Sequence, residues 1–444
     1  MFKRSFILSI ITLLLVTNST TQARELSLND AIQLALLENE DIQKVTLNIQ
    51  KMGELVKQIG ASRWFRIDAT FGYEADRINQ ENLAFVNNTM DPKGSLIPRT
   101  YKINNAFYNG SANIHLFQPL DTFGKIGASI KAAKYGVTMS KHQKKLIQRE
   151  LRYATTLAYY SAILSDVMLE ISKKSYKNAL KSKKLIQGAA ISRPIKSDLI
   201  RVSSDIALRK PEVDKDKYIK KESYRALKIL CNLPENEAIT LTSEFNKLFT
   251  DLNQDLLKGK LNHYPEFEIL KSASDMYCSQ AYAKKAEKYP DLVAYGGYTK
   301  AFKSRSANLS GSRNDNVAYI GINIKIPLWD HGMANAASRQ KKIEAQKTEI
   351  DLSKRRKELQ QQLNNAMEKH EIYLEVYKNQ KKALNLANKS YQTSLSRFKV
   401  GKTSATELND AEMRLTGAHK GLSIIIFELN TLKAKTQKLT EDVA

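Results

Sequence analysis

Two long stretches of the chain place apolar residues at heptad spacing. Within residues 332–399 the small and apolar positions advance by four and three residues in turn from Leu359 and Leu363 onward, and residues 124–191 repeat this step from Tyr153 onward. Neither stretch contains Pro, and both are rich in residues that favour helix. We therefore predict two helices of about 67 residues, each roughly 100 Å long, that pack side by side with other helices.

A helix breaker follows each long stretch and predicts a tight turn with a returning helix. The first breaker is Ile191-Ser192-Arg193-Pro194, in which Pro194 suits the first position of a new helix. The second is Val400-Gly401-Lys402-Thr403-Ser404, in which Gly401 suits the residue just past a helix end and Thr403 or Ser404 suits an N-cap. The chain is therefore expected to reverse direction after both long helices.

Strict alternation of apolar and polar residues predicts a strand over residues 317–328. One face carries Ala318, Ile320, Ile322, Ile324 and Ile326, and the other carries Tyr319, Gly321, Asn323 and Lys325. A strand of about 10 to 12 residues with one aliphatic face has the length and pattern of a tilted transmembrane strand. We predict that the four isoleucines face lipid. A soluble strand with its apolar face on a core is the alternative interpretation.

The two halves of the chain repeat each other. Pro119-Leu120-Asp121-Thr122-Phe123-Gly124 is matched 208 residues later by Pro327-Leu328-Trp329-Asp330-His331-Gly332, with Pro and Gly in register. A duplicated unit of about 200 residues is too long for a solenoid repeat, so we interpret the chain as two copies of one module. Pro119 and Pro327 are expected to end strands, and Gly124 and Gly332 to relax the bend from strand into helix.

Together these patterns predict a mainly α chain with a small β part. Residues 1–23 are expected to be a removed signal peptide, 24–231 repeat 1, 232–263 a linker, 264–438 repeat 2 and 439–444 a tail. Repeat 1 is expected to contain an N-terminal helix, strand 66–76, loop 77–103, strand 104–118, long helix 124–191 and return helix 195–231. Repeat 2 is expected to contain helix 265–289, strand 291–299, loop 300–316, strand 317–328, long helix 332–399 and return helix 404–438. A short strand is expected in the linker, at Ala238 to Leu241.

The first 23 residues have the form of an export signal. Lys3 and Arg4 precede an apolar run from Phe6 to Val16, and Thr21-Gln22-Ala23 supplies a cleavage site. The run is shorter than the roughly 20 residues of a membrane-spanning helix. No later stretch approaches about 18 consecutive apolar residues, so any membrane contact is expected from strands or an amphipathic surface.

Charge and candidate chemistry narrow the function classes. The formal net charge is +24, but Lys pairs lie along helical faces between Glu and Gln, which favours a solvated helix surface over nucleic-acid binding. Cys231 and Cys278 lie one in each half without metal-site spacing, and whether they pair is left open. The six His residues are scattered, and no catalytic triad order or phosphate-binding fingerprint occurs. We predict no enzyme activity, no metal and no cofactor.

The predicted number of strands requires several chains. Four strands cannot close a transmembrane barrel, which needs at least about eight. An open sheet edge in lipid would also leave backbone groups without hydrogen bonds. Each chain is therefore expected to contribute four strands to one shared barrel.

Taken in order, these features resemble the TolC family of outer-membrane efflux and secretion channels, from Leu26 to about residue 438. The start at Leu28-Asn29-Asp30-Ala31-Ile32 is similar to the family's N-terminal helix, and the Pro-x4-Gly corners are similar to its strand-to-helix transitions. The resemblance implies a homotrimer with a 12-stranded β-barrel in the outer membrane and a 12-helix periplasmic tunnel. It implies a periplasmic adaptor (membrane fusion) protein, an inner-membrane pump and outer-membrane lipid as partners. It further implies a passive exit for drugs, other small molecules or proteins.

The resemblance also assigns roles to residues near the helix tips. Glu407 and Asp410 lie three residues apart on one helical face and match the acidic ring that lines the family's periplasmic entrance, where such rings attract cations. First-turn acids that complement the helix dipole are the alternative interpretation. The adaptor-docking tips correspond to Val400, Gly401, Lys402, Thr403, Ile191, Ser192 and Arg193. Thr403 stands where family members often carry an Arg that holds the entrance shut, so a charged lock is not expected there.

Other classes of protein remain open at the level of sequence. A soluble periplasmic coiled-coil scaffold without a pore would share the long helices, and the isoleucine face argues against it. A basic nucleic-acid-binding rod would share the net charge, and the export signal argues against it. Trp329 and Phe123 follow the strands, where an interfacial aromatic belt or packing at the corner would both place them. The sequence does not separate small-molecule efflux from protein secretion.

Overall fold

The computed structural model describes residues 24–87, 96–189, 196–242, 259, 261–304 and 313–440. The expected signal peptide and the tip residues Ile191, Ser192 and Arg193 lie outside the described residues. The chain divides into two compact units. The helical unit comprises Met1–Ile49, Thr138–Lys271 and Glu349–Ala444, and the strand unit comprises Gln50–Val137 and Ser272–Thr348.

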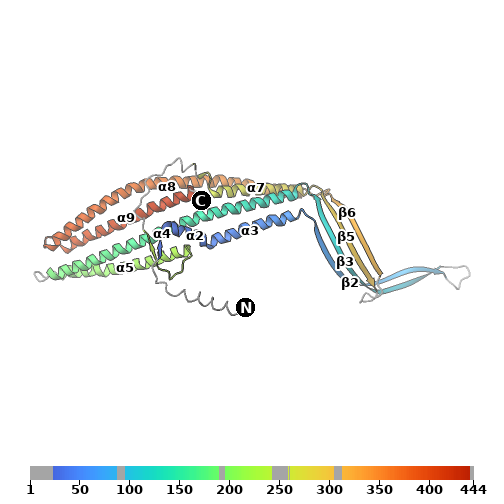
Figure 1. The fold of residues 1–444 in the computed structure, drawn as a ribbon, viewed down its shortest axis with the longest axis horizontal. Coiled ribbons are helices and arrows are strands. Elements are labelled where there is room, and N and C mark those ends of the chain that lie inside the picture. The colour runs from blue at the N-terminus through green and yellow to red at the C-terminus, as the bar shows by residue number, and fades with distance from the viewer. Residues whose placement is uncertain are drawn as a thin grey trace, which may run out of the picture. The chain divides into compact units, whose positions relative to one another are not determined.

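Long helices make up most of the described chain (Figure 1). α4 (Lys125–Ala189) and α8 (Met333–Lys399) contain 65 and 67 residues, close to the stretches predicted from the heptad pattern. α5 (Lys196–Leu230) follows α4, and α9 (Ala405–Thr440) follows α8. We call α4 with α5 the first hairpin and α8 with α9 the second hairpin. The predicted helix-rich fold is confirmed.

The N-terminal helical segment is divided into two helices. α2 (Leu28–Glu38) begins at a capping box, in which Ser27 Oγ accepts a hydrogen bond from the Asp30 amide and the Asp30 carboxylate accepts one from the Ser27 amide, both at 3.2 Å. Asn39 caps the end of α2, and α3 (Glu40–Ala61) begins at the next residue. β1 (Arg24–Leu26) pairs in parallel with β4 (Ile239–Leu241), which confirms the short strand expected in the linker.

The core of the helical unit consists of heptad residues and of residues around the β1–β4 pair. Tyr391 of α8 packs against Leu408, Ala411 and Leu415 of α9. Near the short sheet, the fully buried Tyr159 of α4 donates hydrogen bonds shared between the carbonyl oxygens of Leu26, at 3.0 Å, and Thr242, at 2.7 Å. The hydroxyl of Tyr159 therefore ties a long helix to the segments that leave the short sheet.

The strand unit contains one antiparallel sheet of strand order β2-β3-β5-β6 (Figure 1). Its strands are β2 (Arg66–Asn87), β3 (Leu96–Asp121), β5 (Asp291–Ser304) and β6 (Arg313–Lys325). α7 (Pro265–Ala286) precedes β5 along the chain. Among the strands that the structure describes, β2 and β6 are the two edges of this sheet, so each has one side without a described strand partner.

The predicted loops 77–103 and 300–316 were wrong over much of their length. β2 continues to Asn87 and β3 begins at Leu96, while β5 continues to Ser304 and β6 begins at Arg313. The prediction required an apolar face, which these outer segments lack, whereas backbone pairing does not depend on side-chain polarity. Residues 88–95 and 305–312 lie outside the described residues.

The two prolines differ in their relation to the strands. Pro327 follows the end of β6 at Lys325, so this proline lies beyond the ladder as predicted, although the strand is shorter than the predicted 317–328. Pro119 lies inside β3, where it pairs with Val293, so the prediction that it ends its strand was wrong. The β2 ladder stops at Phe117, and a proline is tolerated where one side of its strand has no partner.

Candidate functional site

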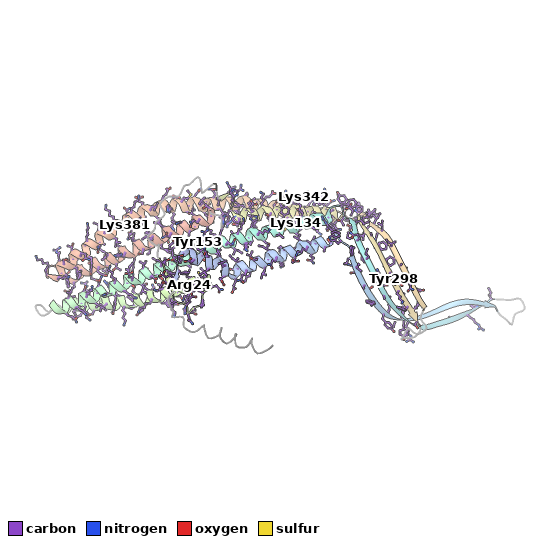
Figure 2. The ribbon with its side chains drawn as sticks, viewed as in Figure 1. Arg24, Lys134, Tyr153, Tyr298, Lys342 and Lys381 are labelled. Atoms are coloured by element: carbon purple, nitrogen blue, oxygen red, sulfur yellow. The ribbon has the colours of Figure 1, made fainter. Side chains whose placement is uncertain are left out.

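One face of the sheet is apolar across all four strands. Register pairing puts Ile320 beside Gly296, then Leu116, then Ile67, and residues two apart along each strand share this face. The face carries Ile67, Ala69, Phe71, Tyr73, Ala112, Ile114, Leu116, Leu292, Ala294, Tyr298, Ala318, Ile320, Ile322 and Ile324. Figure 2 labels Tyr298 on β5.

Side chains of the apolar face are exposed in the single chain. Ile320, Ile322 and Ile324 are 92%, 64% and 57% exposed, and Ile326, one residue past β6, is 55% exposed. A contiguous apolar surface of this kind marks a region that lipid or another protein covers. The face therefore matches the pattern predicted for Ile320, Ile322, Ile324 and Ile326.

The opposite sheet face is polar and contains an aromatic row. His115 of β3 and Tyr319 of β6 belong to one cross-strand row, and the Nδ1 of His115 lies 2.5 Å from the hydroxyl of Tyr319. Gly297 of β5 lies between them in that row. A Cβ atom at Gly297 would lie 2.5 Å from the Ile114 carbonyl oxygen and 2.5 Å from the Tyr319 hydroxyl. The tyrosine can cross β5 because this position is glycine.

The two strand-to-helix corners have the same backbone conformation. Phe123 and Gly124 have φ of 47° and 80°, and His331 and Gly332 have φ of 49° and 80°. Each corner therefore places two successive residues in the left-handed region, which glycine adopts without strain. Positive φ at Gly124 and Gly332 agrees with their predicted role in the bend, which stays a prediction. The left-handed residue before each glycine was missed, because Phe123 gives no signal and His331 gives only a weak one.

A carboxylate stabilises each corner. Asp330 Oδ1 accepts a hydrogen bond from the Gly332 amide at 2.8 Å, and its Oδ2 accepts one from the Ala334 amide at 3.0 Å. These bonds, that from Ala334 first, lower the pKa of Asp330. In the first corner Asp121 Oδ1 accepts from the Phe123 amide at 2.8 Å. Trp329 is 79% exposed and donates to His331 Nδ1 at 3.0 Å, while the ring of Phe123 lies 5.9 Å from that of Tyr289.

The turn of the second hairpin is a Schellman motif closed at Gly401. The Gly401 amide donates to the Phe398 carbonyl at 3.0 Å, the Lys402 amide donates to the Arg397 carbonyl at 2.9 Å, and Gly401 has φ of 71°. Ser404 is the N-cap of α9, because its Oγ accepts from the Glu407 amide at 3.2 Å. The predicted position of Gly401 just past the helix end is confirmed, and Ser404 is the N-cap of the two candidates.

Glu407 and Asp410 lie in the first turns of α9, and both are exposed. The Glu407 carboxylate accepts a hydrogen bond from Thr403, which lies one turn before it. Among the described residues, neither carboxylate has a cation within ion-pairing distance. Leu408 and Ala411, on the other side of the helix, are buried. The arrangement presents two carboxylates from one helical face, as the spacing predicted.

A buried polar network around Arg209 of α5 was not predicted from the sequence. Its Nη1 forms an ion pair with Glu412 of α9 and donates to Ser175 Oγ of α4 at 2.6 Å. Its Nη2 donates to Asn409 Oδ1 of α9 at 2.7 Å. Arg209 therefore joins the first hairpin to the second, and its α9 partners Asn409 and Glu412 lie within one helical turn of Asp410.

Two further contacts join the hairpins, and one of them links equivalent positions of the internal repeats. Lys420 of α9 forms an ion pair with Glu212 of α5, and the two residues are 208 positions apart, which is the offset between the repeats. Arg201 of α5 donates to Thr406 Oγ1 of α9 at 2.6 Å. A search for opposite charges at equivalent positions of the two repeats would have found Lys420 and Glu212 from the sequence.

The environment shifts several titratable groups of the helical unit. Burial, followed by the charge of Lys174, lowers the pKa of His419. Burial also lowers the pKa of His142, beside Glu268 and Lys145. Burial raises the pKa of the Cys231 thiol to about 11. Cys231 and Cys278 are both free thiols, the first buried and the second exposed.

The described residues contain neither a membrane-spanning helix nor a metal site. None of the described helices combines the length and the apolar character needed to cross a membrane. No group of three or more His, Cys, Asp or Glu side chains in the described part of the chain is arranged to hold a metal ion.

Comparison with known proteins gives one family match. A family model described as outer membrane efflux protein matches residues 265–424. No curated protein matches the chain.

Solved structures share the fold over nearly the whole chain. A structure of CusC, described as concerning folding and transmembrane channel formation, has a TM-score of 0.75 at 16% identity and covers 96% of this chain and 95% of its own. The open state of the MtrE outer membrane channel of Neisseria gonorrhoeae has a TM-score of 0.74 at 17% identity, covering 93% and 88%. The CmeC outer membrane channel of Campylobacter jejuni has a TM-score of 0.73 at 15% identity, covering 93% and 85%. At these identities the likeness establishes the fold.

The outer membrane efflux protein match confirms the resemblance inferred from the sequence. The matched region is residues 265–424, and the solved structures support the same fold over nearly the whole chain. The matching family model and the solved structures of VceC and MtrE are described as outer membrane proteins, which agrees with the location expected from the sequence.

Proposed function

We propose that three copies of the chain form a passive exit duct in the outer membrane. In this proposal the duct receives drugs, other small molecules or proteins from an inner-membrane pump through a periplasmic adaptor (membrane fusion) protein. The observation that carries the proposal is the four-stranded sheet with one apolar face and two unpaired edges. The family match supports it independently.

The two sheet edges support assembly into a barrel. Edge strands β2 and β6 each have one side without a partner among the described strands, and such a side in lipid leaves several backbone groups unsatisfied. Pairing of β6 of one chain with β2 of the next removes every edge when the ring closes. Three chains would give the 12-stranded barrel that the resemblance implies. The apolar face then meets lipid, and the face with His115 and Tyr319 lines the interior.

The entrance is proposed to lie at the helix tips. In a trimer Glu407 and Asp410 would each contribute three exposed carboxylates around one axis, an arrangement that attracts cations. Opening would require the second hairpin to move away from the first. The buried contact of Arg209 with Glu412 resists that movement, because separation would break the ion pair and the hydrogen bond from Arg209 to Asn409. We therefore infer that this pair, and not Thr403, supplies the charged lock of the closed entrance.

Docking of the adaptor is proposed at the turns of the hairpins. Val400 is 67% exposed, and Gly401 and Lys402 are also exposed. An exposed apolar residue next to a rigid Schellman turn offers a fixed contact for a helical partner. The corresponding proposal for Ile191, Ser192 and Arg193 rests on the sequence alone, because they lie outside the described residues.

Light scattering of the detergent-purified mature protein tests the assembly. The proposal predicts a protein mass of three chains and recovery of the protein with the outer membrane. A single chain or a trimer in the aqueous periplasmic fraction would contradict it and would favour the soluble coiled-coil scaffold.

A further inference from the structure

A cavity in the helical unit brings four cationic side chains together. Its volume is about 200 Å³, and its lining comes from α2, α4 and α9. The cations are Arg149 and Arg152 of α4 and Lys433 and Lys438 of α9. No Asp or Glu belongs to this lining, which consists of residues that the structure describes.

The cations point from two facing helices. The α4 residues of the lining advance by three, one and three residues and so share one face of the helix: Arg149, Arg152, Tyr153 and Thr156. On α9 the lining residues Ala434 and Gln437 lie between Lys433 and Lys438 on one face. Figure 2 labels Tyr153 on the α4 face. The packing of α4 and α9 therefore also brings their cations together.

Two of these cations have contacts within the chain that the structure describes. Lys438 Nζ lies 3.6 Å from a Glu150 carboxylate whose side chain is 54% exposed. Asp30, which follows the lining residue Asn29, is itself outside the lining, and its carboxylate accepts hydrogen bonds from the Ser27 hydroxyl at 2.6 Å and from the Ser27 amide at 3.2 Å. Arg149 is only 3% exposed, and its guanidinium lies 5.3 Å from the centre of the Tyr264 ring. Four like charges around one cavity repel one another, and a bound anion offsets this repulsion.

Neutral hydrogen-bond donors complete the lining. Asn29, Asn430 and Gln437 supply amide groups, and Thr156 supplies a hydroxyl. Leu28 and Asn29 belong to the first turn of α2, whose amide dipoles also favour a negative charge. The cavity thus offers cations and donors from three elements that are distant in the sequence.

We propose that this cavity binds a small oxyanion with at least two negative charges, such as inorganic phosphate or a dicarboxylate. The guanidinium groups of Arg149 and Arg152 match pairs of carboxylate or phosphate oxygens, and the Lys433 and Lys438 ammonium groups neutralise the remaining charge. The bound anion ties α2 and α9 to α4 and stabilises the helical unit in proportion to its occupancy.

Calorimetric titration of the full mature protein in detergent tests the site with inorganic phosphate and with succinate. Sodium chloride at equal ionic strength is the reference. We expect saturable binding near one anion per chain with a Kd below about 1 mM for at least one of the two. The anion that binds more tightly assigns the class. No saturable binding of either up to about 10 mM overturns the proposal.

A matched pair of variants separates the site from general screening. Arg152→Gln/Lys433→Gln is expected to weaken binding by about tenfold or more, because two charge-assisted contacts are lost. Lys141→Gln/Lys435→Gln removes the same charge from the same helices outside the lining and is expected to change the Kd by less than about twofold. Equal weakening in both variants overturns the proposal. Should circular dichroism show that the first variant is unfolded, Lys433→Gln alone replaces it, with about threefold weakening expected.

Discussion

Arg209 of α5 and Glu412 of α9 form a nearly buried ion pair that joins the two helical hairpins. Their side chains are 10% and 5% exposed. Asn409 and Ser175 accept further hydrogen bonds from the same guanidinium, at 2.7 and 2.6 Å, so the charge of Arg209 is satisfied by three partners. The contact lies close along α9 to the carboxylates proposed to line the entrance.

Removal of one partner of this pair is expected to loosen the hairpins. Glu412→Gln leaves Arg209 buried with less compensation, which costs about 3–5 kcal/mol when a buried pair is broken from one side. We expect a lower melting temperature and longer open times in single-channel recordings. Glu428→Gln is the control, since Glu428 pairs with Lys369 at 3.2 Å within the second hairpin. Equal open times in the two variants would contradict a lock at Arg209 and Glu412.

Neutralising the proposed acidic ring is expected to change selectivity without unfolding the protein. Glu407 and Asp410 are exposed, so Glu407→Gln/Asp410→Asn removes surface charge while the helix core remains intact. The cation-over-anion permeability ratio should fall toward unity, and block by divalent cations should weaken. Glu349→Gln/Asp351→Asn, two exposed acids of α8, is the control. Unchanged selectivity in the first variant would remove the ring from the account.

Lysine substitutions on the two faces of β6 are expected to affect membrane assembly differently. Ile322→Lys places a charge on the face proposed to meet lipid and is expected to cost about 2–4 kcal/mol near the bilayer midplane. Asn323→Lys changes the next residue of the same strand, on the opposite face, and should assemble normally. The amounts of folded protein in outer membranes measure the difference. Equal amounts of the two variants would count against lipid contact by this face.

The row of His115, Gly297 and Tyr319 predicts a requirement for glycine in β5. In Gly297→Ala the new Cβ would lie 2.5 Å from the Ile114 backbone oxygen, and such overpacking costs about 1–3 kcal/mol. In Gly296→Ala the nearest atom lies at 3.4 Å, so a smaller effect is expected. Thermal unfolding in detergent distinguishes the two variants. A Gly297→Ala protein as stable as Gly296→Ala would show that the tyrosine does not need this gap.

The lowered pKa values of His142 and His419 predict lower stability in acid. Both lie below the usual 6.5, so the unfolded chain binds protons that the folded helical unit does not. The stability that these groups contribute is present above that pH and is lost as the pH falls through it toward the folded-state values. The melting temperature should therefore drop between about pH 7.5 and about pH 5.5. His142→Gln/His419→Gln should reduce this drop, whereas the exposed His263→Gln should not.

Local signals explain why much of the fold could be predicted from the sequence. The heptad steps identified α4 and α8 because side-chain burial in long helices repeats along the chain. Gly401 identified the turn because its positive φ favours glycine over other residues. The outer parts of β2 and β3 gave no comparable signal, since they lack an apolar face and are defined by their pairing with each other.

The candidate site was predictable only where its geometry is local. The shared face of Glu407 and Asp410 follows from their spacing within one helix. The contact of Arg209 with Glu412 joins residues 203 positions apart and depends on the packing of three helices. The left-handed backbone of Phe123 was likewise invisible, because phenylalanine does not favour that conformation, whereas the enrichment of histidine in it made His331 a weak signal that went unused.

Single-channel conductance of the detergent-purified mature protein in planar bilayers tests the central claim most directly. The account predicts discrete, cation-selective steps from a protein whose mass is that of three chains, with longer open times in Glu412→Gln. A protein that gives no conductance in either the unmodified form or Glu412→Gln would contradict the exit duct.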